Sequence, residues 1–293
     1  MIALTDMAQQ PLAYLDEQFL ESEEGRPLRI LSEYLEPLRR FKDQNIQDTV
    51  VFFGSARVEP RERAERALKT LRARGLSETQ AQFQAELARS RKAVDWARFY
   101  EDAREVARRL TSWSMTLGSE HHRFVVTSGG GPGIMEAANR GATEAGGKTI
   151  GLNIRLPFEQ GANDYITDGL HFEFHYFFMR KFWFAYLATA IVVFPGGFGT
   201  LDEMFEILTL AQTDKLSKKI AVILYGREYW EKVINLEPMV EWGAIADEDK
   251  QLLKWADTPD EAFDQLRAHL EEHHLEPKTA QEAAAPGIAK TRG

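Results

Sequence analysis

The stretch AIVVFPGGFGTLDE, residues 190–203, joins an apolar run to a glycine-rich turn and then to a helical pattern. Its apolar part, residues 191–194, is continuous rather than alternating, which is typical of a strand covered on both faces of a parallel sheet. The pattern that starts near Thr200 indicates a helix. This stretch therefore predicts a strand, a tight turn and a helix in succession, which is the repeating unit of an α/β fold.

Four other short runs have a similar strand-like composition, and helical patterns such as residues 133–147 lie between the strands. These runs are residues 49–54, 123–128, 148–154 and 219–226. Strands that alternate with helices indicate an α/β fold with a doubly wound parallel sheet and helices on both faces. Ligands bind beyond the carboxyl ends of the strands in such sheets, and both glycine clusters of this chain fall there.

Three segments lie outside this alternation. Residues 1–48 contain a helical pattern with Pro27 suited to its first turn, so we expect an N-terminal helical arm that packs on the domain. Residues 58–117 are predicted to be helical, and their interleaved charges fit either a solvated helix face or a phosphate-binding patch. We assign residues 49–275 to one domain that contains this helical insertion, and we expect residues 276–293 to form a disordered tail.

Composition excludes several classes of protein. The chain has 293 residues, of which 44% are hydrophobic, so it can bury a substantial core. It contains no cysteine, which excludes a disulfide framework, a thiolate nucleophile and a cysteine-type zinc site and favours a reducing cytoplasm. No stretch is apolar enough for a membrane span, and the net charge of −9 disfavours non-specific nucleic-acid binding. A small anionic ligand remains compatible with a local site.

The glycine-rich turn predicts an anion-binding site. Gly196, Gly197 and Gly199 allow the backbone N–H groups to approach a phosphate closely, and the following helix adds the positive end of its dipole. Residues 129–133 repeat this arrangement before another helix. Two such turns at one sheet edge indicate a phosphorylated ligand, of which the protein also recognises a second group besides the phosphate.

Two pairs of polar residues, one at the turn and one in the aromatic stretch before it, have both structural and functional interpretations. Thr200 and Glu203 have the spacing of a capping box, in which the glutamate only closes the start of the helix. Alternatively, Glu203 points away from the phosphate, toward a sugar. Arg180 and Lys181 lie in an aromatic stretch, where they either extend to solvent from a core helix or pair with an anion.

Several familiar motifs are absent or misplaced. Residues 142–149 resemble a P-loop, but they run from a helix into a strand, which is the wrong order. Neither glycine cluster has the G-x-G-x-x-G spacing of a dinucleotide site, and no G-x-S-x-G serine-hydrolase motif occurs. His171 and His175 flank Glu173 on a short predicted strand and do not resemble a metal site. We therefore expect no metal and no redox cofactor.

Three segments, in order, carry a family resemblance: GGGPGIMEAANRGA at residues 129–142, MRK at 179–181 and PGGFGTLDE at 195–203. Together they resemble the LOG (Lonely Guy) family of phosphoribohydrolases. The resemblance begins near FFGSAR, residues 52–57, and extends to about Gly226. It implies a Rossmann-like fold and a nucleotide-binding catalytic domain. The implied reaction is hydrolysis of the N-glycosidic bond of a nucleoside 5′-monophosphate to a free base and ribose 5-phosphate, and the implied substrate class includes cytokinin ribotides.

The resemblance also implies roles for individual residues and for the assembly. Arg180 and Glu203 match the catalytic pair of the family, and the chain would form at least a homodimer. A molybdenum-cofactor carrier of the same fold uses a similar phosphate site without turnover, so non-catalytic ligand binding is the alternative. The residues implied in substrate binding are Gly130, Gly131, Lys181, Gly196, Gly197, Gly199, Thr200, Ser55, Arg57 and Glu136.

Overall fold

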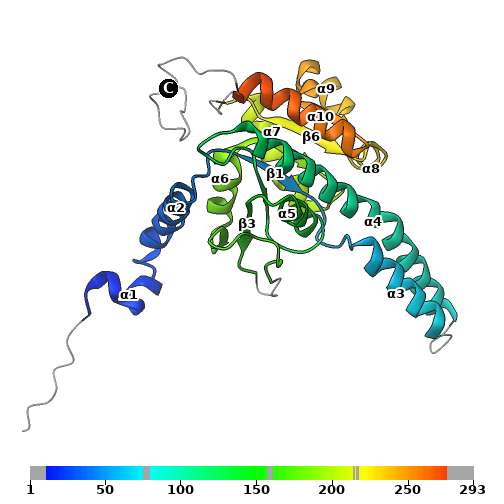
Figure 1. Ribbon diagram of the computed structural model, residues 1–293, viewed down its shortest axis with the longest axis horizontal. Coiled ribbons are helices and arrows are strands. Elements are labelled where there is room, and N and C mark those ends of the chain that lie inside the picture. Colours follow the sequence, from blue (N-terminus) through cyan, green and yellow to red (C-terminus); the bar gives the residue numbers. More distant parts are fainter. Residues whose placement is uncertain (1–10, 75–79, 157–160, 214, 216–217, 276–293) are drawn as a thin grey trace, which may run out of the picture.

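The computed structural model describes residues 11–74, 80–156, 161–213, 215 and 218–275. In these residues the chain forms a seven-stranded, all-parallel sheet with the strand order β4-β3-β2-β1-β5-β6-β7 (Figure 1). The strands are β1 Thr49–Phe53, β2 Val125–Ser128, β3 Thr149–Ile154, β4 His171–Phe174, β5 Ala188–Val193, β6 Ala221–Tyr225 and β7 Leu253–Ala256.

The predicted doubly wound sheet is confirmed, and its strand order contains one reversal. From β1 the chain proceeds outward through β2, β3 and β4, whereas β5, β6 and β7 are added on the other side of β1. The reversal lies between the neighbouring strands β1 and β5, whose carboxyl ends diverge into connections on opposite sides. Ligands of open α/β sheets bind at such a point.

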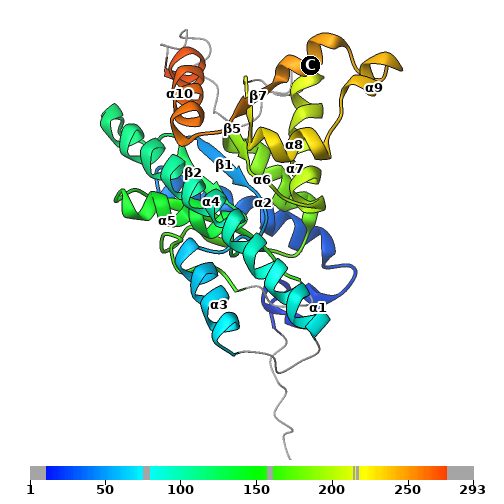
Figure 2. The same cartoon turned by 90° about the vertical axis from the view of Figure 1, so that its right-hand side faces the viewer.

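Helices cover both faces of the sheet. Helices α4, α5 and α10 pack on one face, and α2, α6, α7 and α8 pack on the other (Figures 1 and 2). The helices are α1 Glu17–Glu21, α2 Arg26–Asp43, α3 Arg61–Arg74, α4 Gln80–Ser114, α5 Ile134–Glu144, α6 Phe177–Leu187, α7 Phe198–Gln212, α8 Arg227–Val233, α9 Glu237–Glu241 and α10 Pro259–Leu270. Short helical turns occupy Ala13–Leu15, Met115–Leu117, Asp247–Leu252 and Glu271–Leu275.

The two layers of helices explain why the strands read as continuous apolar runs. In β1, Val50 and Phe52 belong to the core on the α4 face, and Val51 and Phe53 belong to the core on the α6 face. All five residues of this strand are buried. Alternate side chains therefore enter two different cores, and each position must be apolar or nearly so.

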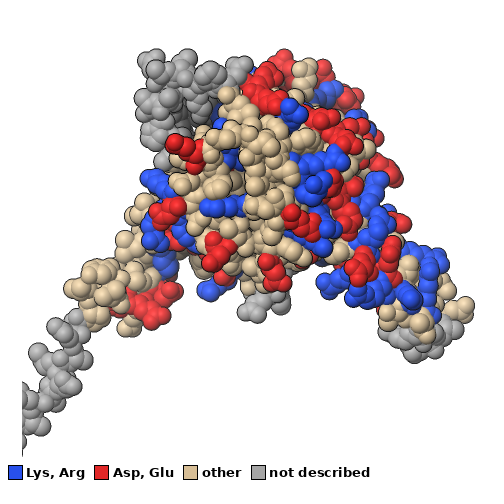
Figure 3. Space-filling view, viewed as in Figure 1, with Lys and Arg blue, Asp and Glu red and all other residues tan. Residues whose placement is uncertain are grey.

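The segment predicted as a helical insertion, residues 58–117, contains the crossover helix that joins β1 to β2. The part of α4 from Ala97 to Leu110 is buried on the sheet. The earlier part of α4 pairs with α3, and this helical hairpin extends away from the body of the molecule (Figure 1). Positive and negative side chains are interspersed over α3 and α4 (Figure 3), and many pair with one another, as Arg66 does with Glu62. This pattern supports the solvated-face interpretation of the charges.

The described part of the N-terminal arm packs on the domain, as expected. Pro27 lies in the first turn of α2, and Phe41 of this helix is buried in the core. The indole Nε1 of Trp183 in α6 donates a 2.8 Å hydrogen bond to the carbonyl oxygen of Glu33. The predicted tail, residues 276–293, lies outside the described residues. Among the helices of the described segments, none is long and apolar enough to cross a membrane.

A buried histidine in α10 gives the fold a predicted sensitivity to acid. His269 is 6% exposed, its Nε2 lies 3.3 Å from the carbonyl oxygen of Lys219, and burial lowers its pKa from 6.5 to about 4. Above pH 6.5 the imidazole is neutral in both states, so its contribution to stability is complete. As the pH falls from 6.5 to about 4, only the unfolded chain gains the proton, and the free energy of unfolding falls by about 3 kcal/mol.

Denaturant unfolding between pH 4 and pH 8 tests this prediction with His269→Gln, which retains a donor toward Lys219. The decline in the free energy of unfolding should be smaller in the variant than in the wild type by about 3 kcal/mol. Parallel curves for the two proteins would show that His269 does not carry the effect.

Candidate active site

A cleft of about 670 Å³ opens at the reversal of strand order. Its walls come from the segment after β1, the turn after β2, one face of α6 and the turn after β5. Two arginines, Arg57 and Arg180, line it, and none of the lining residues in the described chain is acidic. The cleft thus lies at the place where this class of sheet binds ligands, and its lining favours an anion.

The turn after β5 presents free backbone donors to the cleft. Helix α7 begins at Phe198, two residues earlier than expected, and its N-cap is Gly197, which provides no side-chain cap. The first N–H groups of a helix have no partner within the helix, so those of α7 can bind an anion. Gly196, Gly197, Phe198, Gly199 and Thr200 all line the cleft.

The glycines of this turn have different structural requirements. A Cβ atom at Gly196 would lie 2.1 Å from Thr200 Oγ1, whereas a Cβ at Gly197 or Gly199 would meet nothing within 4 Å. The carbonyl oxygen of Gly196 also accepts a 2.7 Å hydrogen bond from Tyr229 Oη. Gly196 is therefore required by the packing of the turn itself, and the other two leave room for a ligand.

We expect Gly196→Ala to destabilise the protein by about 1–3 kcal/mol, because the added methyl group displaces Thr200. The displaced turn should also bind inorganic phosphate at least about ten-fold more weakly, since charge-assisted hydrogen bonds depend on donor geometry. Gly199→Ala is the matched control for stability, because its methyl group enters open space, and it should not lower the free energy of unfolding. Urea unfolding and phosphate titration calorimetry measure both effects; equal loss of stability in the two variants would contradict the packing role of Gly196.

Of the two interpretations of Glu203, the structure does not support the capping box at the start of α7. Thr200 is the third residue of the helix, and its N–H donates a 3.0 Å hydrogen bond to the carbonyl oxygen of Gly197. Because the helix starts earlier than expected, Glu203 lies in the second turn, where it cannot reach the N-cap. Its side chain is only 6% exposed. Helix capping therefore does not account for this buried carboxylate.

Glu203 instead forms a buried ion pair with Arg180 of α6. Arg180 Nη2 donates a 3.1 Å hydrogen bond to Glu203 Oε1, and the arginine side chain is 17% exposed. Burial raises the pKa of Glu203, opposed by Arg180 and Lys181, and burial lowers the pKa of Arg180. Both shifts show that the fold holds charges here against a desolvation cost, which is common at functional sites.

Arg180 extends toward the cleft and does not snorkel to bulk solvent. Its guanidinium lies 5.4 Å and 5.6 Å from the ring centroids of Phe177 and Phe184. Its Nε is buried and has no hydrogen-bond partner in the described chain. A buried donor without a partner costs free energy. Arg180 lines the cleft and its side chain is 17% exposed, so the exposed part of this cation can contact an anionic or electron-rich group there.

Comparison with known proteins finds a matching family model and similar proteins of the LOG family. A family model described as "Possible lysine decarboxylase" matches residues 135–266. LOG6 of Arabidopsis thaliana, a probable cytokinin riboside 5′-monophosphate phosphoribohydrolase, is 27% identical over 149 residues, which are 51% of this chain and 74% of that protein. The cytokinin riboside 5′-monophosphate phosphoribohydrolase of Rhodococcoides fascians is 30% identical over 113 residues, 38% of this chain and 56% of that protein. Over about half of its length, the chain is similar to members of the LOG family.

The LOG resemblance inferred from the sequence is thereby confirmed. Among solved structures, the Moco Carrier Protein from Chlamydomonas reinhardtii has 18% identity and a TM-score of 0.42, with 77% of this chain and 99% of that chain covered. At such low similarity no functional conclusion rests on this structure. The aligned parts of the two LOG proteins span 74% and 56% of their length. Sequence similarity alone therefore does not establish which reaction this chain catalyses.

The structure brings most of the residues implied by the LOG resemblance into the cleft. Those that line it are Ser55, Arg57, Arg180, Gly196, Gly197, Gly199 and Thr200. Glu203 lies directly behind Arg180, its hydrogen-bond partner. These residues come from three segments that are distant in sequence, which follow β1, lie in α6 and follow β5, and they meet at the carboxyl edge of the sheet. Their roles in binding and catalysis stay predictions.

Lys181 lies behind the cleft and contacts acidic residues of α7. Its Nζ lies 2.9 Å from both Asp202 Oδ2 and Glu206 Oε2, and 3.8 Å from Glu203 Oε2. Although partial burial alone would lower it, the pKa of Lys181 is raised by its hydrogen bonds to Asp202 and Glu206. This arrangement suits a residue that positions α7 against α6 better than one that contacts substrate.

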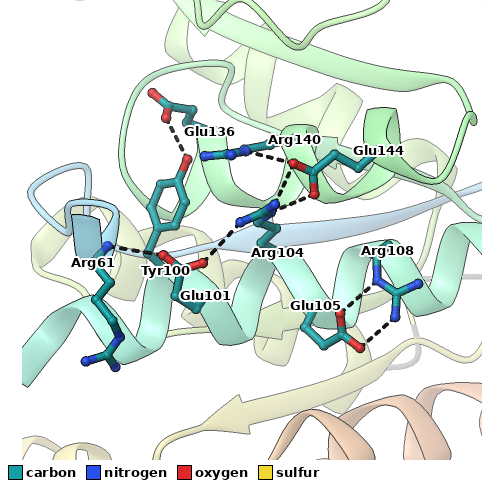
Figure 4. A network of polar contacts seen from close by, with 9 residues as sticks. All are labelled: Arg61, Tyr100, Glu101, Arg104, Glu105, Arg108, Glu136, Arg140 and Glu144. Atoms are coloured by element: carbon teal, nitrogen blue, oxygen red, sulfur yellow. Dashed lines mark hydrogen bonds and ion pairs between the residues drawn. The ribbon is translucent and has the colours of Figure 1, made fainter. Parts of the chain in front are cut away.

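The turn after β2 contributes less of its predicted set. Gly129 lines the cleft, but Gly130 and Gly131 do not, and their carbonyl oxygens accept hydrogen bonds from Asn163 Nδ2. Gly130 has φ +73°, and a Cβ there would lie 1.8 Å from the side-chain oxygen of a neighbouring asparagine. Glu136 accepts a 2.6 Å hydrogen bond from Tyr100 Oη (Figure 4). Glu136 thus joins α5 to α4 instead of facing the cleft.

Sequence reasoning missed the large aromatic and apolar lining residues, which are Phe53, Trp96, Met135, Phe184, Phe198 and Tyr229. The helical period of α4 gave a signal only for the positions that face the sheet, and Trp96 lies outside that set. Phe198 is 92% exposed at the first position of α7. The position of this aromatic residue between two glycines of the turn was a sequence signal that could have been used.

Proposed function

We propose that this protein hydrolyses the N-glycosidic bond of a nucleoside 5′-monophosphate and releases the free base and ribose 5-phosphate. The observation that carries the proposal is the buried pair of Arg180 and Glu203 beside the uncapped start of α7. An anion-binding turn alone would suit many ligands. A buried carboxylate held one turn further along the same helix adds a group suited to sugar chemistry.

The 5′-phosphate would bind at the turn of residues 196–200. The free N–H groups of α7 and the Thr200 hydroxyl would supply hydrogen bonds to the phosphate oxygens. Ser55 and Arg57, at the carboxyl end of β1, line the same cleft and would add a hydroxyl and a charge. Fixing the phosphate there orients the ribose, which converts binding energy into orientation of the scissile bond.

Cleavage of the N-glycosidic bond generates positive charge on the ribose. The bond between C1′ and the base nitrogen breaks, the base leaves with the electron pair, and water supplies a hydroxyl to C1′ and a proton to the base. The carboxylate of Glu203 would stabilise the oxocarbenium-like state or position the water. Arg180 would keep the carboxylate ionised and oriented, and its positive charge beside the cleft would stabilise charge that develops on the departing base.

Incubation with nucleotides tests this function. AMP, CMP, GMP, UMP and isopentenyladenosine 5′-monophosphate are each supplied to the full chain, and free base and ribose 5-phosphate are quantified. The names of the LOG relatives make the isopentenyladenosine nucleotide a natural member of this set. We expect equimolar base and ribose 5-phosphate from at least one nucleotide. A nucleotide or pterin ligand that stays bound without product would instead indicate a carrier protein.

A further inference from the structure

Helix α4, from the long connection between β1 and β2, supplies one wall of the proposed active-site cleft. Trp96 of this helix lines the cleft together with the glycine-rich turn of residues 196–200, although the two are about 100 residues apart in the sequence. The Trp96 side chain is half-buried. It therefore presents part of an aromatic surface to the space beside the turn.

Trp96 is held between two other aromatic rings. Its ring centroid lies 5.6 Å from that of Tyr229 and 6.2 Å from that of Phe99, both in edge-to-face geometry. Tyr229 Oη donates a hydrogen bond to the carbonyl oxygen of Gly196, so the aromatic cluster that contains Trp96 also contacts the glycine-rich turn. Phe99 packs against Gly226 at the start of α8, where a Cβ atom would lie 2.8 Å from the ring. The indole thus has a fixed place relative to the turn.

A polar network fixes α4 one turn beyond Trp96. Tyr100 Oη donates to Glu136, and Arg104 makes two hydrogen bonds, of 2.6 Å and 2.7 Å, to the carboxylate of Glu144 (Figure 4). Arg140 also donates to Glu144, at 2.9 Å. Glu136 and Glu144 belong to α5, which begins directly after the turn that follows β2. The network therefore sets the position of α4, and with it Trp96, against the glycine-rich edge of the sheet.

We infer that Trp96 is a specificity-determining residue that packs against the planar base of the nucleotide. This inference rests on the proposed function. The phosphate and the ribose need hydrogen-bond donors and acceptors, which the turn, Arg180 and Glu203 supply. A rigid indole surface offers mainly apolar and stacking contact, which matches a flat heterocycle. The connection between β1 and β2 would then have a function in substrate selection besides its packing on the sheet.

Comparison of two ligands separates a base contact from an effect on the turn. Glu203→Gln protein, which should bind nucleotide without turnover, is titrated with a nucleoside 5′-monophosphate and with ribose 5-phosphate, which lacks the base. Adding Trp96→Ala should weaken binding of the nucleotide by about 5- to 100-fold, since base–aromatic stacking has this size. Binding of ribose 5-phosphate should change by less than about two-fold.

Two further variants serve as controls. Trp96→Phe keeps an aromatic ring and should recover most of the nucleotide affinity. Trp242→Ala removes an indole that is 88% exposed and outside the cleft, and it should change neither affinity. Equal weakening of both ligands by Trp96→Ala, or no weakening of either, would overturn the inference and leave the proposed function intact. Failure of both ligands to bind the protein with Trp96 in place would overturn the proposed function and this inference together.

Discussion

Glu203→Gln should lower kcat by at least about 100-fold, because the amide carries no charge to stabilise an oxocarbenium-like state or to activate water. The same change should leave the fold nearly intact. Arg180 Nη2 can still donate to the amide oxygen, so we expect the free energy of unfolding to change by less than about 2 kcal/mol. Release of ribose 5-phosphate and urea unfolding measure the two effects separately.

Glu206→Gln is the matched control for this variant. Glu206 lies on the same helix, one turn further along, and contacts Lys181 but does not line the cleft. It should retain activity within about two-fold, since a partly exposed ion pair contributes little. Similar loss of kcat in both variants would show that α7 needs its acidic charge in general and not at Glu203 in particular.

The pH profile of the wild type gives an independent check on Glu203. Burial raises the pKa of this carboxyl above its ordinary value of 4.5, and the proposed mechanism uses its ionised form. Activity should be complete at high pH and decline as the pH falls through that raised pKa. A decline centred below pH 4.5 would assign the titrating group to an ordinary, solvated carboxylate.

Arg180→Met should cause the largest loss of stability among the site variants. It leaves the Glu203 carboxylate buried, with Lys181 Nζ at 3.8 Å as the nearest remaining cation. Removing one partner of a buried ion pair costs about 3–5 kcal/mol, and we expect that fall in the free energy of unfolding at pH 7. Activity should fall at least about 100-fold as well, because the cation beside the cleft is lost.

The double variant Arg180→Met with Glu203→Leu separates folding from catalysis. Replacing a buried ion pair by apolar residues of similar size is often neutral or stabilising, so the double variant should regain most of the lost stability. It should stay inactive. Arg155→Met is the control, because Arg155 pairs with Glu173 on the surface, and its loss should cost less than about 1 kcal/mol. A double variant no more stable than Arg180→Met would contradict the assignment of the cost to an unpaired carboxylate.

The fold could be predicted from the sequence where burial acts on both faces of a strand. The runs at 49–54 and 190–196 are mostly apolar at successive positions because their side chains enter two cores. This continuous apolar pattern is visible in a single sequence. Strand β7 left no such signal. It lies at the edge of the sheet, is four residues long, and exposes Lys254, so its pattern is that of a loop.

The candidate site was harder to predict than the fold because its residues meet only in three dimensions. The spacing of Thr200 and Glu203 satisfied a local rule for capping, but the rule depends on where the helix begins. That start is set by Gly197, whose extended backbone lets the helix begin at Phe198. Trp96 gave no signal at all, because its neighbours in the cleft come from the turn after β5 and from α8.

The central claim is that a phosphate bound at the start of α7 brings the glycosidic bond to Glu203. The most direct measurement compares a nucleoside 5′-monophosphate with its own nucleoside, at equal concentration, by release of the free base. We expect kcat/KM for the nucleotide to exceed that for the nucleoside by at least about 100-fold, which two charge-assisted hydrogen bonds can supply. Equal cleavage of the two compounds, or cleavage of neither, would contradict the claim.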